Sequence, residues 1–502
     1  MVNKVLSASF NGLDCQAIEV QVDVSNGFPS FNIVGLTDTS IQESKERVRS
    51  SIINSGYKFP TTRKTINLAP AQLRKHGSIF DLAIALGILI SSKQIQVPSI
   101  EDSIILGELS LNGNLNKIPG VLPITQYAKQ QNYQRIILPS DNADEASFIK
   151  GINIIPVKSL LETIDFLQNG TIPSNKKAQK TFHLSPQKTE KPFEGIIGQH
   201  QAKRALSIAV AGRHNILIKG SPGCGKTLLS KSVKSLLPPM SKEEILDTTK
   251  IFSVVGNLSK DQPLINRRPF REVHHTASIS SLIGGGRKFP QPGEISLAHN
   301  GILFLDEISE FQKHSLEALR QPMEDKFITI NRVEFTAKFP CNFMLIATTN
   351  PCPCGYYLDK KYRCNCSQRQ IDNYQKKISG PLIDRFDLFL NVQRIDLSGN
   401  IINTNSDNEI YKEKIHRAHK MQENRYRASK SINRNKDMDL PTIREFCKLD
   451  KKSEDTLKSL TKRLNLSNRS YLKVLRVSRT IADLEESPQI QLQHILEASQ
   501  YR

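Results

Sequence analysis

The chain has 502 residues, of which 38% are hydrophobic, and it carries a formal net charge of +20. The length predicts roughly two to four domains, and the hydrophobic content excludes a wholly disordered chain. The excess of positive charge favours a polyanionic partner, nucleic acid before an anionic membrane, although a solvated lysine-rich surface would account for it as well.

The sequence lacks the features of a secreted or membrane-spanning chain. Residues 1–16 do not show the apolar core and cleavage site of a signal peptide. The longest apolar run, residues 82–90, is far shorter than the roughly 18 residues that span a bilayer. Eight cysteines in a chain of this length do not make a disulfide scaffold. We therefore expect a cytoplasmic protein that has no membrane partner.

Residues 1–167 are predicted to form an α/β domain, because strand-like and helix-like patterns alternate along them. The expected strands cover residues 5–10, 17–24, 64–68 and 103–111, and the expected helices cover residues 41–55 and 81–92. Residues 143–152 and 156–164 complete the domain.

Residues 168–191 are polar and are predicted to be a linker. Strand and helix then alternate over residues 192–396, as in a parallel α/β sheet, beginning with a helix at 199–211 and a strand at 215–219. After a second polar stretch, residues 409–502 are basic and helical in pattern. The expected helices cover residues 415–429, 441–449, 453–465, 467–484 and 489–499.

The most specific motif lies between the strand at 215–219 and an expected helix at 228–237, and it fits the P-loop pattern G-x-x-x-x-G-K-[ST] in full. Its glycines let backbone N–H groups point at phosphate oxygens, and the helix N-terminus adds positive partial charge. We expect the loop to bind ATP, with Lys226 at the β- and γ-phosphates and the Thr227 hydroxyl on Mg²⁺. The loop consists of Gly220, Ser221, Pro222, Gly223, Cys224, Gly225, Lys226 and Thr227.

Two later apolar strands end in polar residues that fit the same site. Residues 302–305 precede Asp306 and Glu307, and residues 343–349 precede Asn350. In a P-loop ATPase the first carboxylate helps to hold Mg²⁺ and the second acts as general base toward the attacking water. Asn350 would hydrogen-bond that water or the γ-phosphate. The alternative for Asp306 and Glu307 is a surface acidic turn, and the alternative for Asn350 is an ordinary asparagine at a strand end.

Four cysteines fall close together as Cys352-x-Cys354 and Cys364-x-Cys366. Four thiolates in such a short segment would bind Zn²⁺ tetrahedrally, although one residue separates each pair where two to four are usual. The alternative is four reduced thiols in a surface loop.

Together these motifs resemble Walker A, Walker B and sensor 1 of an AAA+ ATPase. The segment Pro292-Gly-Glu-Ile-Ser-Leu-Ala-His-Asn-Gly301 is similar to the branch that holds magnesium-chelatase ATPase subunits and MCM helicases. Further long motifs are similar to those of the ComM (YifB) proteins, which are bacterial magnesium-chelatase-like ATPases. The likeness covers nearly the whole chain outside the linker, with motifs at residues 11–14, 31–36, 77–82, 268–278, 284–286, 350–355, 379–385 and 475–484.

The resemblance implies roles for two arginines. Arg385, in Ser379-Gly-Pro-Leu-Ile-Asp-Arg385, matches the arginine finger that reaches a neighbouring subunit's γ-phosphate, which implies a homo-hexameric ring. A salt bridge at a helix end is the alternative for Arg385 taken alone. Arg469 matches sensor 2, a lid-domain cation over the phosphates, although Asn468 and Ser470 stand where the family often has alanine.

Two segments resemble hairpins that grip DNA inside MCM-like rings. Residues 270–290 resemble the insert within helix 2, and residues 327–336 alternate in strand period around an expected turn at Asn331-Arg332. Arg287, Lys288 and Arg332 would contact phosphates without reading bases. For each cation alone, a solvated loop side chain is the alternative.

The N-terminal domain resembles the proteolytic domain of Lon in a noncatalytic form. Lon-type proteolysis needs a Ser–Lys dyad, and the matching positions hold Ile79 and Leu122. Ser78 is one position away, but no matching lysine follows it. We therefore expect a structural or DNA-handling domain and not a protease.

The expected fold is α/β: a Lon-protease-like noncatalytic domain (1–167), an AAA+ P-loop core with a four-cysteine knuckle (192–396) and a C-terminal helical lid (409–502). The resemblance implies an ATP-driven motor on single-stranded or branched DNA that moves recombination intermediates in natural transformation, with ATP and Mg²⁺ and with Zn²⁺ at the cysteines. The alternative is an AAA+ remodelling ATPase that acts on a protein or metal-insertion partner.

Overall fold

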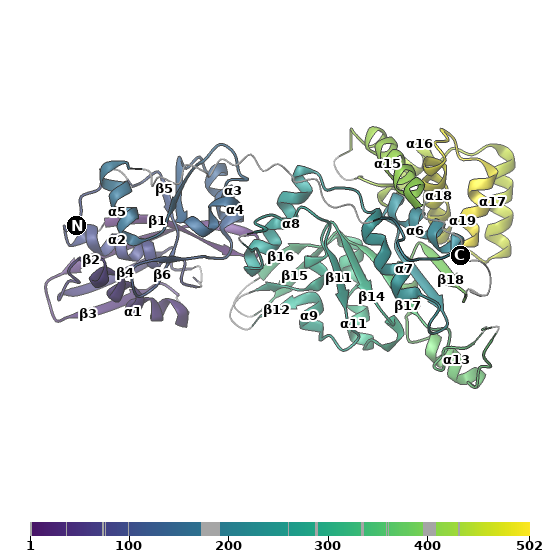
Figure 1. The fold of residues 1–502 in the computed structure, drawn as a ribbon, viewed down its shortest axis with the longest axis horizontal. Coiled ribbons are helices and arrows are strands. Elements are labelled where there is room, and N and C mark those ends of the chain that lie inside the picture. The colour runs from purple at the N-terminus through teal and green to yellow at the C-terminus, as the bar shows by residue number, and fades with distance from the viewer. Residues whose placement is uncertain are drawn as a thin grey trace.

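The structure of the chain is a computed structural model, drawn in Figure 1. It describes residues 3–36, 38–72, 75, 77–98, 100–171, 191–259, 261–286, 290–332, 336–357, 359, 361–394, 408–429 and 432–502. Three parts follow one another along an elongated molecule: an N-terminal α/β region, a central region with a five-stranded sheet, and a group of C-terminal helices (Figure 1). None of the helices in these ranges combines the length and the apolar character that a bilayer span requires.

The N-terminal region is built on a sheet in the order β1 (Asn3–Asn11), β2 (Asp14–Ser25), β4 (Arg63–Ala69) and β3 (Ser30–Val34). Neighbouring strands are antiparallel, except that β3 and β4 are parallel. Alternate residues of β4 are buried, which is the pattern of a sheet with one covered face. The helix α2 (Asp81–Ser91) packs on β1 and β2 and is buried along most of its length, which explains its continuous apolar sequence. The helix α1 (Thr39–Asn54) also packs on α2.

A second sheet of this region is parallel and has the order β5 (Ser103–Ile105), β8 (Arg135–Pro139) and β9 (Asn153–Val157). The single strand expected at residues 103–111 is divided, because β6 (Glu108–Leu109) leaves β5 and pairs with β7 (Leu115–Asn116). Gly107 lies at the division, where a Cβ atom would meet Leu115 Cδ2 at 2.7 Å. The remaining elements are α3 (Val121–Gln130), η1 (Ser140–Asn142), α4 (Ala143–Ala146) and α5 (Leu160–Asn169).

The central sheet has five parallel strands in the order β11 (Phe270–Val273), β14 (Ile302–Leu305), β17 (Met344–Thr349), β10 (Ile216–Gly220) and β18 (Leu388–Val392). Every residue of β14 and β17 is buried, as the continuous apolar runs of central parallel strands require. The chain leaves β10, returns through β11, β14 and β17 on one side, and adds β18 on the other. Ligands of such sheets bind at the carboxyl ends of the strands beside this switch in order.

Helices cover the central sheet. The helix α6 (His200–Gly212) precedes β10 and α7 (Lys226–Ser232) follows it, and the helix expected to reach residue 237 changes to the 3₁₀ turn η2 (Val233–Leu236). A capping box between Ser241 and Glu244 starts α8. The other helices are α8 (Lys242–Val255), α10 (Glu294–Leu297), η3 (Ile308–Glu310), α11 (Lys313–Glu317), α12 (Arg320–Asp325), α13 (Gln368–Gln375) and α14 (Gly380–Ile383).

The insert expected at residues 270–290 begins later than predicted. Its first four residues are β11, which pairs with β14 at the edge of the central sheet. The insert itself consists of α9 (Ile279–Ile283) and a short hairpin of β12 (Gly284–Gly285) and β13 (Gln291–Pro292). Residues 270–273 therefore belong to the central sheet and not to the insert.

The hairpin expected at residues 327–336 is longer than predicted, because β15 (Phe327–Asn331) pairs with β16 (Thr336–Pro340). Asn331 lies opposite Thr336, so the tight turn predicted at Asn331-Arg332 is wrong. The observed register is set by burial, since it places four apolar side chains on one covered face. These residues are Ile328, Ile330, Ala337 and Phe339.

The described C-terminal residues form α15 (Asn408–Arg425), η4 (Asn435–Asp437), α16 (Leu440–Phe446), α17 (Lys451–Arg463), α18 (Asn468–Leu484) and α19 (Leu492–Gln500). The helix α18 is central and contacts α6, α15 and α19. Its Asp483 is fully buried and accepts hydrogen bonds from Arg425 (2.8 Å), Arg479 (3.1 Å) and the Asn435 amide (2.8 Å). This network ties α15 and η4 to α18.

The N-terminal region contacts the central region at two places. At the first, α3 lies beside α8 (Figure 1), the Gly120 N–H donates to the Ser253 carbonyl at 2.9 Å, and the Ser253 hydroxyl donates to Glu145. Burial raises the pKa of Glu145. At the second, the Asn11 amide of the β1–β2 turn donates to the Thr336 carbonyl of β16 at 3.1 Å. The two regions therefore meet through polar contacts and through apolar packing, since Leu13 and Phe148 pack against buried clusters of the central region.

Candidate active site

The P-loop motif forms the turn between β10 and α7, at the carboxyl edge of the central sheet. Gly223 and Gly225 have φ angles of 76° and 89°, a conformation that glycine adopts without strain. The Lys226 ammonium donates to the Gly220 carbonyl at 2.7 Å and to Asn350 Oδ1 at 3.0 Å. Burial lowers the pKa of Lys226. The lysine is therefore held inside the turn, and β17 brings Asn350 to it.

Asp306 and Thr227 lie against each other beside this lysine. The Thr227 hydroxyl donates to Asp306 Oδ2 at 3.0 Å, and the Thr348 hydroxyl donates to the other carboxylate oxygen. Both predicted magnesium ligands offer oxygen atoms, which are the ligands that Mg²⁺ prefers. The structure thus brings the ends of β10, β14 and β17 together around a donor set that fits the ion.

Glu307 follows Asp306 and has an exposed side chain. Its φ angle is 53°, and its N–H donates to the Thr348 hydroxyl at 2.9 Å. A non-glycine residue in this region carries a conformational cost and persists only where its surroundings hold it, which is frequent at functional sites. The same threonine therefore positions both members of the acidic pair.

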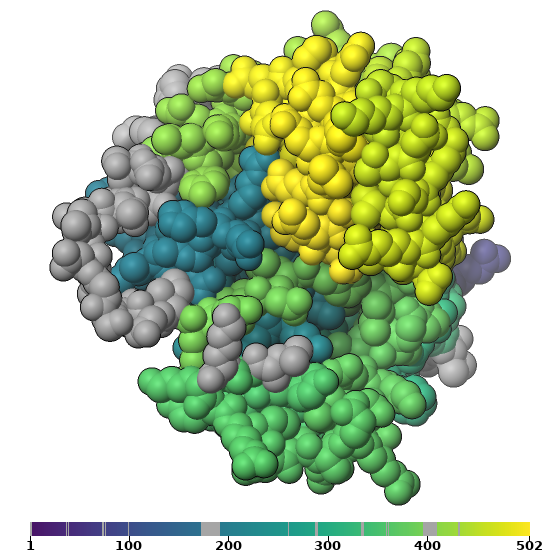
Figure 2. Space-filling model, turned by 90° about the vertical axis from the view of Figure 1, so that its right-hand side faces the viewer, coloured from purple at the N-terminus to yellow at the C-terminus, as the bar shows by residue number. Residues whose placement is uncertain are grey.

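A pocket of about 960 Å³ lies alongside the P-loop. Its lining combines P-loop backbone with apolar side chains of Ile196, Ile197, Leu228 and Val392. Figure 2 shows a hollow between the yellow C-terminal helices and the green segment that carries α13, with blue residues from the start of the central region inside it. The size and mixed lining suit a nucleotide, with apolar surface for a base beside a cradle for phosphates.

Arg385 and Arg469 converge on Glu324 of α12. The Arg385 guanidinium forms an ion pair with this carboxylate, and the Arg469 guanidinium lies 3.8 Å from it. Arg385 precedes β18, which runs parallel to β10, so it lies at the amino edge of the sheet while the P-loop lies at the carboxyl edge. The length of β18 puts roughly 16 Å between these edges at about 3.3 Å per residue. The two arginines therefore share a surface away from their own P-loop.

The four cysteines of the predicted metal site converge, with their Sγ atoms all within 4.8 Å of one another. Cys352 Sγ lies 3.3 Å from Cys354 Sγ and 3.7 Å from Cys364 Sγ, and Cys366 completes the group. The Tyr357 N–H points at Cys352 Sγ at 3.3 Å, which is the kind of outer contact that metal-bound thiolates receive. Four thiols in this arrangement fit a tetrahedral Zn²⁺ ion.

The two hairpins of the central region lie side by side. A Cβ atom on Gly284 would meet Ile330 Cδ1 at 2.7 Å, and one on Gly285 would meet Arg332 Nη2 at 3.4 Å. Arg332 is exposed. The other two predicted DNA-contacting residues, Arg287 and Lys288, lie outside the described residues.

The positions that match the Lon dyad are both buried and apolar in the N-terminal region. Ile79 is 5% exposed and Leu122 is 0% exposed. The neighbouring Ser78 hydroxyl donates to the Glu108 carboxylate. The likeness of this region to Lon stays a prediction.

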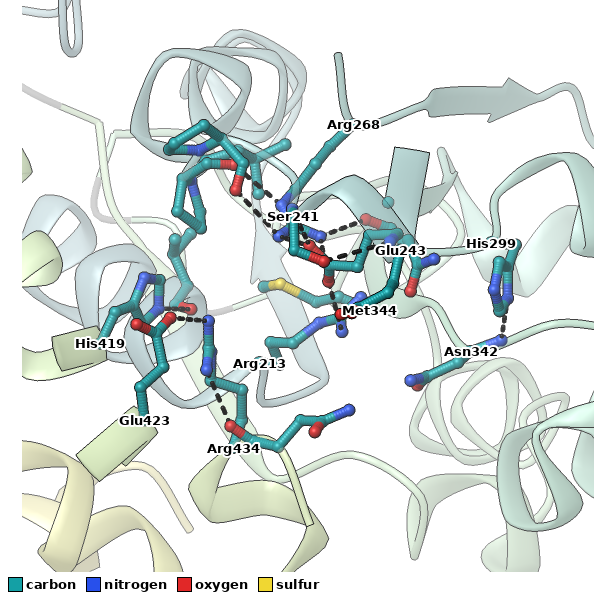
Figure 3. Close-up of a pocket in the computed structure, with 18 of the residues that line it drawn as sticks. Arg213, Ser241, Glu243, Arg268, His299, Asn342, Met344, His419, Glu423 and Arg434 are labelled. Carbon is teal, nitrogen blue, oxygen red and sulfur yellow. Dashed lines mark hydrogen bonds and ion pairs between the residues drawn. The ribbon is translucent and has the colours of Figure 1, made fainter. Parts of the chain in front are cut away.

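A second cavity, of about 590 Å³, lies at the amino edge of the central sheet, between this sheet and the C-terminal helices (Figure 3). Arg268 pairs with Glu244 at 2.7 Å, and burial lowers the pKa of His299 and His419 to about 4 and 3. A lining in which cations and acids balance does not favour a polyphosphate, so the pocket beside the P-loop is the better candidate for a nucleotide. The balanced residues are Arg213, Arg268, Lys420 and Arg434 with Glu243, Glu244, Asp247 and Glu423.

Sequence reasoning missed two residues that line the pocket beside the P-loop, Asp359 and Arg394. Arg394 donates to the Pro222 carbonyl at 2.6 Å and lies 3.5 Å from the Asp359 carboxylate. Neither residue belongs to a recognisable motif. Their proximity follows from the sheet order, because Asp359 follows β17 and Arg394 follows β18, and these strands flank β10.

Comparison with known proteins supports this architecture. The family "Magnesium chelatase, subunit ChlI" matches residues 192–399, "Subunit ChlI of Mg-chelatase" matches residues 20–142, and "Magnesium chelatase, subunit ChlI C-terminal" matches residues 405–502. The magnesium-chelatase subunit ChlI of Euglena gracilis is 25% identical over 183 residues, which cover 32% of this chain and 52% of that protein.

Two of the relatives that match along nearly their whole length are a competence protein and an uncharacterized protein. The competence protein ComM of Haemophilus influenzae is 39% identical over 501 residues, which cover 99% of this chain and 97% of that protein. The uncharacterized protein YifB of Escherichia coli is 38% identical over 491 residues, which cover 98% of this chain and 95% of that protein. The predicted family is confirmed: the chain belongs to the ComM/YifB family of magnesium-chelatase-like AAA+ proteins.

Proposed function

We propose that this chain is an ATP-driven motor that moves on DNA and drives branch migration of recombination intermediates in natural transformation. Membership of the family implies an ATPase that uses Mg²⁺. The observation that carries the proposal is the convergence of Lys226, Thr227, Asp306 and Asn350 at the carboxyl ends of three neighbouring strands. The competence protein of Haemophilus influenzae, a full-length relative, points to the process that the motor serves.

In the proposed reaction, water attacks the γ-phosphate of ATP and releases ADP and phosphate. Mg²⁺ held by Thr227 and Asp306 would neutralise charge on the phosphates. Lys226 binds the phosphates, and Asn350 orients the water or the γ-phosphate. Glu307 accepts the proton of the attacking water as general base. Its backbone hydrogen bond to Thr348 supports this role, because it fixes the backbone that carries the carboxylate next to the metal ligand.

We assign Arg385 and Arg469 to the site of a neighbouring subunit. The length of β18 separates Arg385 from its own P-loop, so only another chain's nucleotide is within its reach. Arg469 shares the same carboxylate partner, Glu324, and would approach the same neighbouring nucleotide. A head-to-tail arrangement in which each chain completes the next chain's site forms a ring when its rotation closes, and we propose a homo-hexamer.

We assign DNA contact to the paired hairpins. Arg332 is exposed where β12–β13 and β15–β16 lie together, and Arg287 and Lys288 fall between β12 and β13 in the sequence. Lysine and arginine at such tips bind phosphates irrespective of sequence, which suits a motor that must pass over any base. The net charge of +20 is consistent with a polyanionic track.

We further propose that Cys352, Cys354, Cys364 and Cys366 bind one structural Zn²⁺. Their mutual distances of at most 4.8 Å are the support for this assignment. A closed site of four thiolates leaves no open position for catalysis, so the ion would hold the loop in shape.

The alternative function is that of an ATPase that remodels a protein or metal-insertion partner. Its support is the match of the central region to the magnesium chelatase ATPase subunit. Such a protein would hydrolyse ATP at the same site, but its rate would respond to a protein partner and not to DNA.

The deciding experiment follows branch migration of a synthetic four-way junction by the native chain and by Lys226→Ala and Glu307→Gln. We expect both variants to lose ATP-dependent migration. The matched controls are Lys242→Ala at the exposed start of α8 and Glu310→Gln in η3, which we expect to act like the native chain. Equal migration by all five proteins, or an ATPase rate that DNA does not stimulate, would contradict the proposal that the chain is a DNA motor.

A further inference from the structure

The segment that carries the four cysteines packs directly on the P-loop. We call its described residues, 351–357, 359 and 361–366, the cysteine knuckle. A Cβ atom on Gly355 would meet Cγ and Cδ of Pro222 at 2.5 Å, so the side chain at position 355 can be no larger than the hydrogen atom of glycine. Pro222 is the third residue of the P-loop motif. Gly355 also has a φ angle of 83°, which other residues adopt at a cost. The backbone of the knuckle thus supports the outside of the phosphate cradle.

Arg394 joins the P-loop to the knuckle through a second set of contacts. Its guanidinium donates to the Pro222 carbonyl at 2.6 Å and lies over the Tyr362 ring, 4.6 Å from the ring centroid. Tyr362 in turn lies 5.2 Å from Tyr356, centroid to centroid. One cation therefore links a P-loop carbonyl to the aromatic side chains between the two cysteine pairs.

Asp359 provides a third link. Its carboxylate lies 3.5 Å from the Arg394 guanidinium that binds the P-loop, and it accepts from the Lys361 and Tyr362 N–H groups at 2.8 and 3.1 Å. The knuckle residues Tyr357, Asp359 and Lys361 line the same pocket as the P-loop glycines. The knuckle is thus one wall of the pocket in which the nucleotide would sit.

We propose that the cysteine knuckle is part of the nucleotide site, and that Zn²⁺ on its four thiolates holds Pro222 and Gly223 in the conformation that binds ATP. This inference rests on the ATP and zinc sites proposed above, and adds that nucleotide affinity depends on zinc. Without the ion, the four thiols no longer share one ligand, so Gly355 and Asp359 are held less firmly in position. The P-loop must then be ordered when ATP binds, which weakens binding.

The test measures zinc content and ATP affinity on the same full-length samples. Zinc is counted by elemental mass spectrometry, and the Kd of a slowly hydrolysed ATP analogue is measured by calorimetry at constant excess Mg²⁺. A chelator selective for zinc over magnesium then removes the ion. We expect about one zinc per chain, and about tenfold weaker ATP binding after its removal that added Zn²⁺ restores.

Gly355→Ala changes the packing of the cysteine knuckle on the P-loop without removing a zinc ligand. It keeps all four cysteines, so we expect unchanged zinc content, but its methyl group presses on Pro222 and should weaken ATP binding about tenfold. Thermal unfolding identifies a variant that fails to fold. Arg394→Gln tests the same wall without backbone strain, with an expected loss of severalfold. Cys15→Ser, a cysteine of the N-terminal region, is the matched control and should change neither quantity.

The outcomes separate this inference from the proposals beneath it. Zinc-bound and zinc-free protein with the same Kd for ATP would overturn the coupling and leave both sites standing. A full-length protein without zinc would overturn the zinc site and the inference together. Failure of every sample to bind ATP would overturn the ATPase assignment itself.

Discussion

Arg385 lies one strand length from its own P-loop, because it precedes β18 while Gly220 pairs with the last residue of that strand. The separation is roughly 16 Å at about 3.3 Å per residue. We therefore expect Arg385→Ala to leave the ATP affinity of its own chain unchanged. Turnover should fall by about 10³-fold or more, which is the usual effect of removing an arginine finger.

Mixing this variant with Lys226→Ala tests whether the finger acts between chains. The Lys226→Ala chain lacks its phosphate-binding cation but keeps its finger, and the Arg385→Ala chain has the reverse defect. In an equal mixture, half of the P-loops keep Lys226, and half of these face a neighbouring chain that keeps Arg385. We therefore expect about a quarter of the native ATPase rate, whereas each variant alone stays near background.

The assay follows phosphate release after reassembly at a series of mixing ratios, and the rate should be highest at equal proportions. Arg417→Ala is the matched control, since Arg417 is an exposed arginine of α15 that pairs with Glu486. In a mixture of the Lys226→Ala and Arg417→Ala chains, the ATPase rate should fall only in proportion to the content of the inactive Lys226→Ala chain. A rate that never exceeds the weighted average of Arg385→Ala and Lys226→Ala would refute an intersubunit finger.

Three further predictions concern stability and DNA binding. Asp483→Ala leaves Arg425 without its buried partner, so we expect a loss of about 3–5 kcal/mol in the free energy of unfolding, measured by urea denaturation. Burial keeps the folded-state pKa of His299 and His419 at about 4 and 3, below the unfolded value, so the stability from neutral imidazole is full above about pH 6.5. The free energy of unfolding should fall between about pH 6.5 and 4 by at most about 1.4 kcal/mol per histidine per pH unit. His419→Gln should make the free energy of unfolding less dependent on pH, as measured by urea titrations at several pH values. Arg332→Ala should weaken binding of all DNA sequences alike and reduce the salt dependence of log K by about one, measured by fluorescence anisotropy over a salt series.

Local patterns were sufficient for the elements that carry the nucleotide site. The strand predicted at residues 215–219 is β10, and the helix predicted at 467–484 is α18, which begins after the Ser467 cap. Both follow from their own composition: a buried apolar run between polar residues, and apolar positions at helical spacing after a capping serine. The motif spacing likewise brought Lys226, Asp306 and Asn350 into one prediction, and the structure places them within hydrogen-bonding reach of their neighbours at the P-loop.

Contacts between distant segments could not be predicted in this way. The shared position of Arg385 and Arg469 at Glu324 depends on where β18 and α18 sit in three dimensions. The contact of Gly355 with Pro222 depends on β17 lying beside β10. The division of the strand at 103–111 and the register of β15 with β16 were missed for a related reason, since the partner strand and the buried face decide them.

The N-terminal region contacts the central region both on α8 and on β16. A body held at two points cannot swivel freely about a single hinge, so it follows any rotation of the part to which it is attached. In the elongated molecule, a small rotation of the central sheet would carry the far end of the N-terminal sheet through a wider sweep (Figure 1). Because one of the two fastenings is on the strand that follows Arg332, that sweep and any displacement of the β15–β16 tip would occur as a single motion.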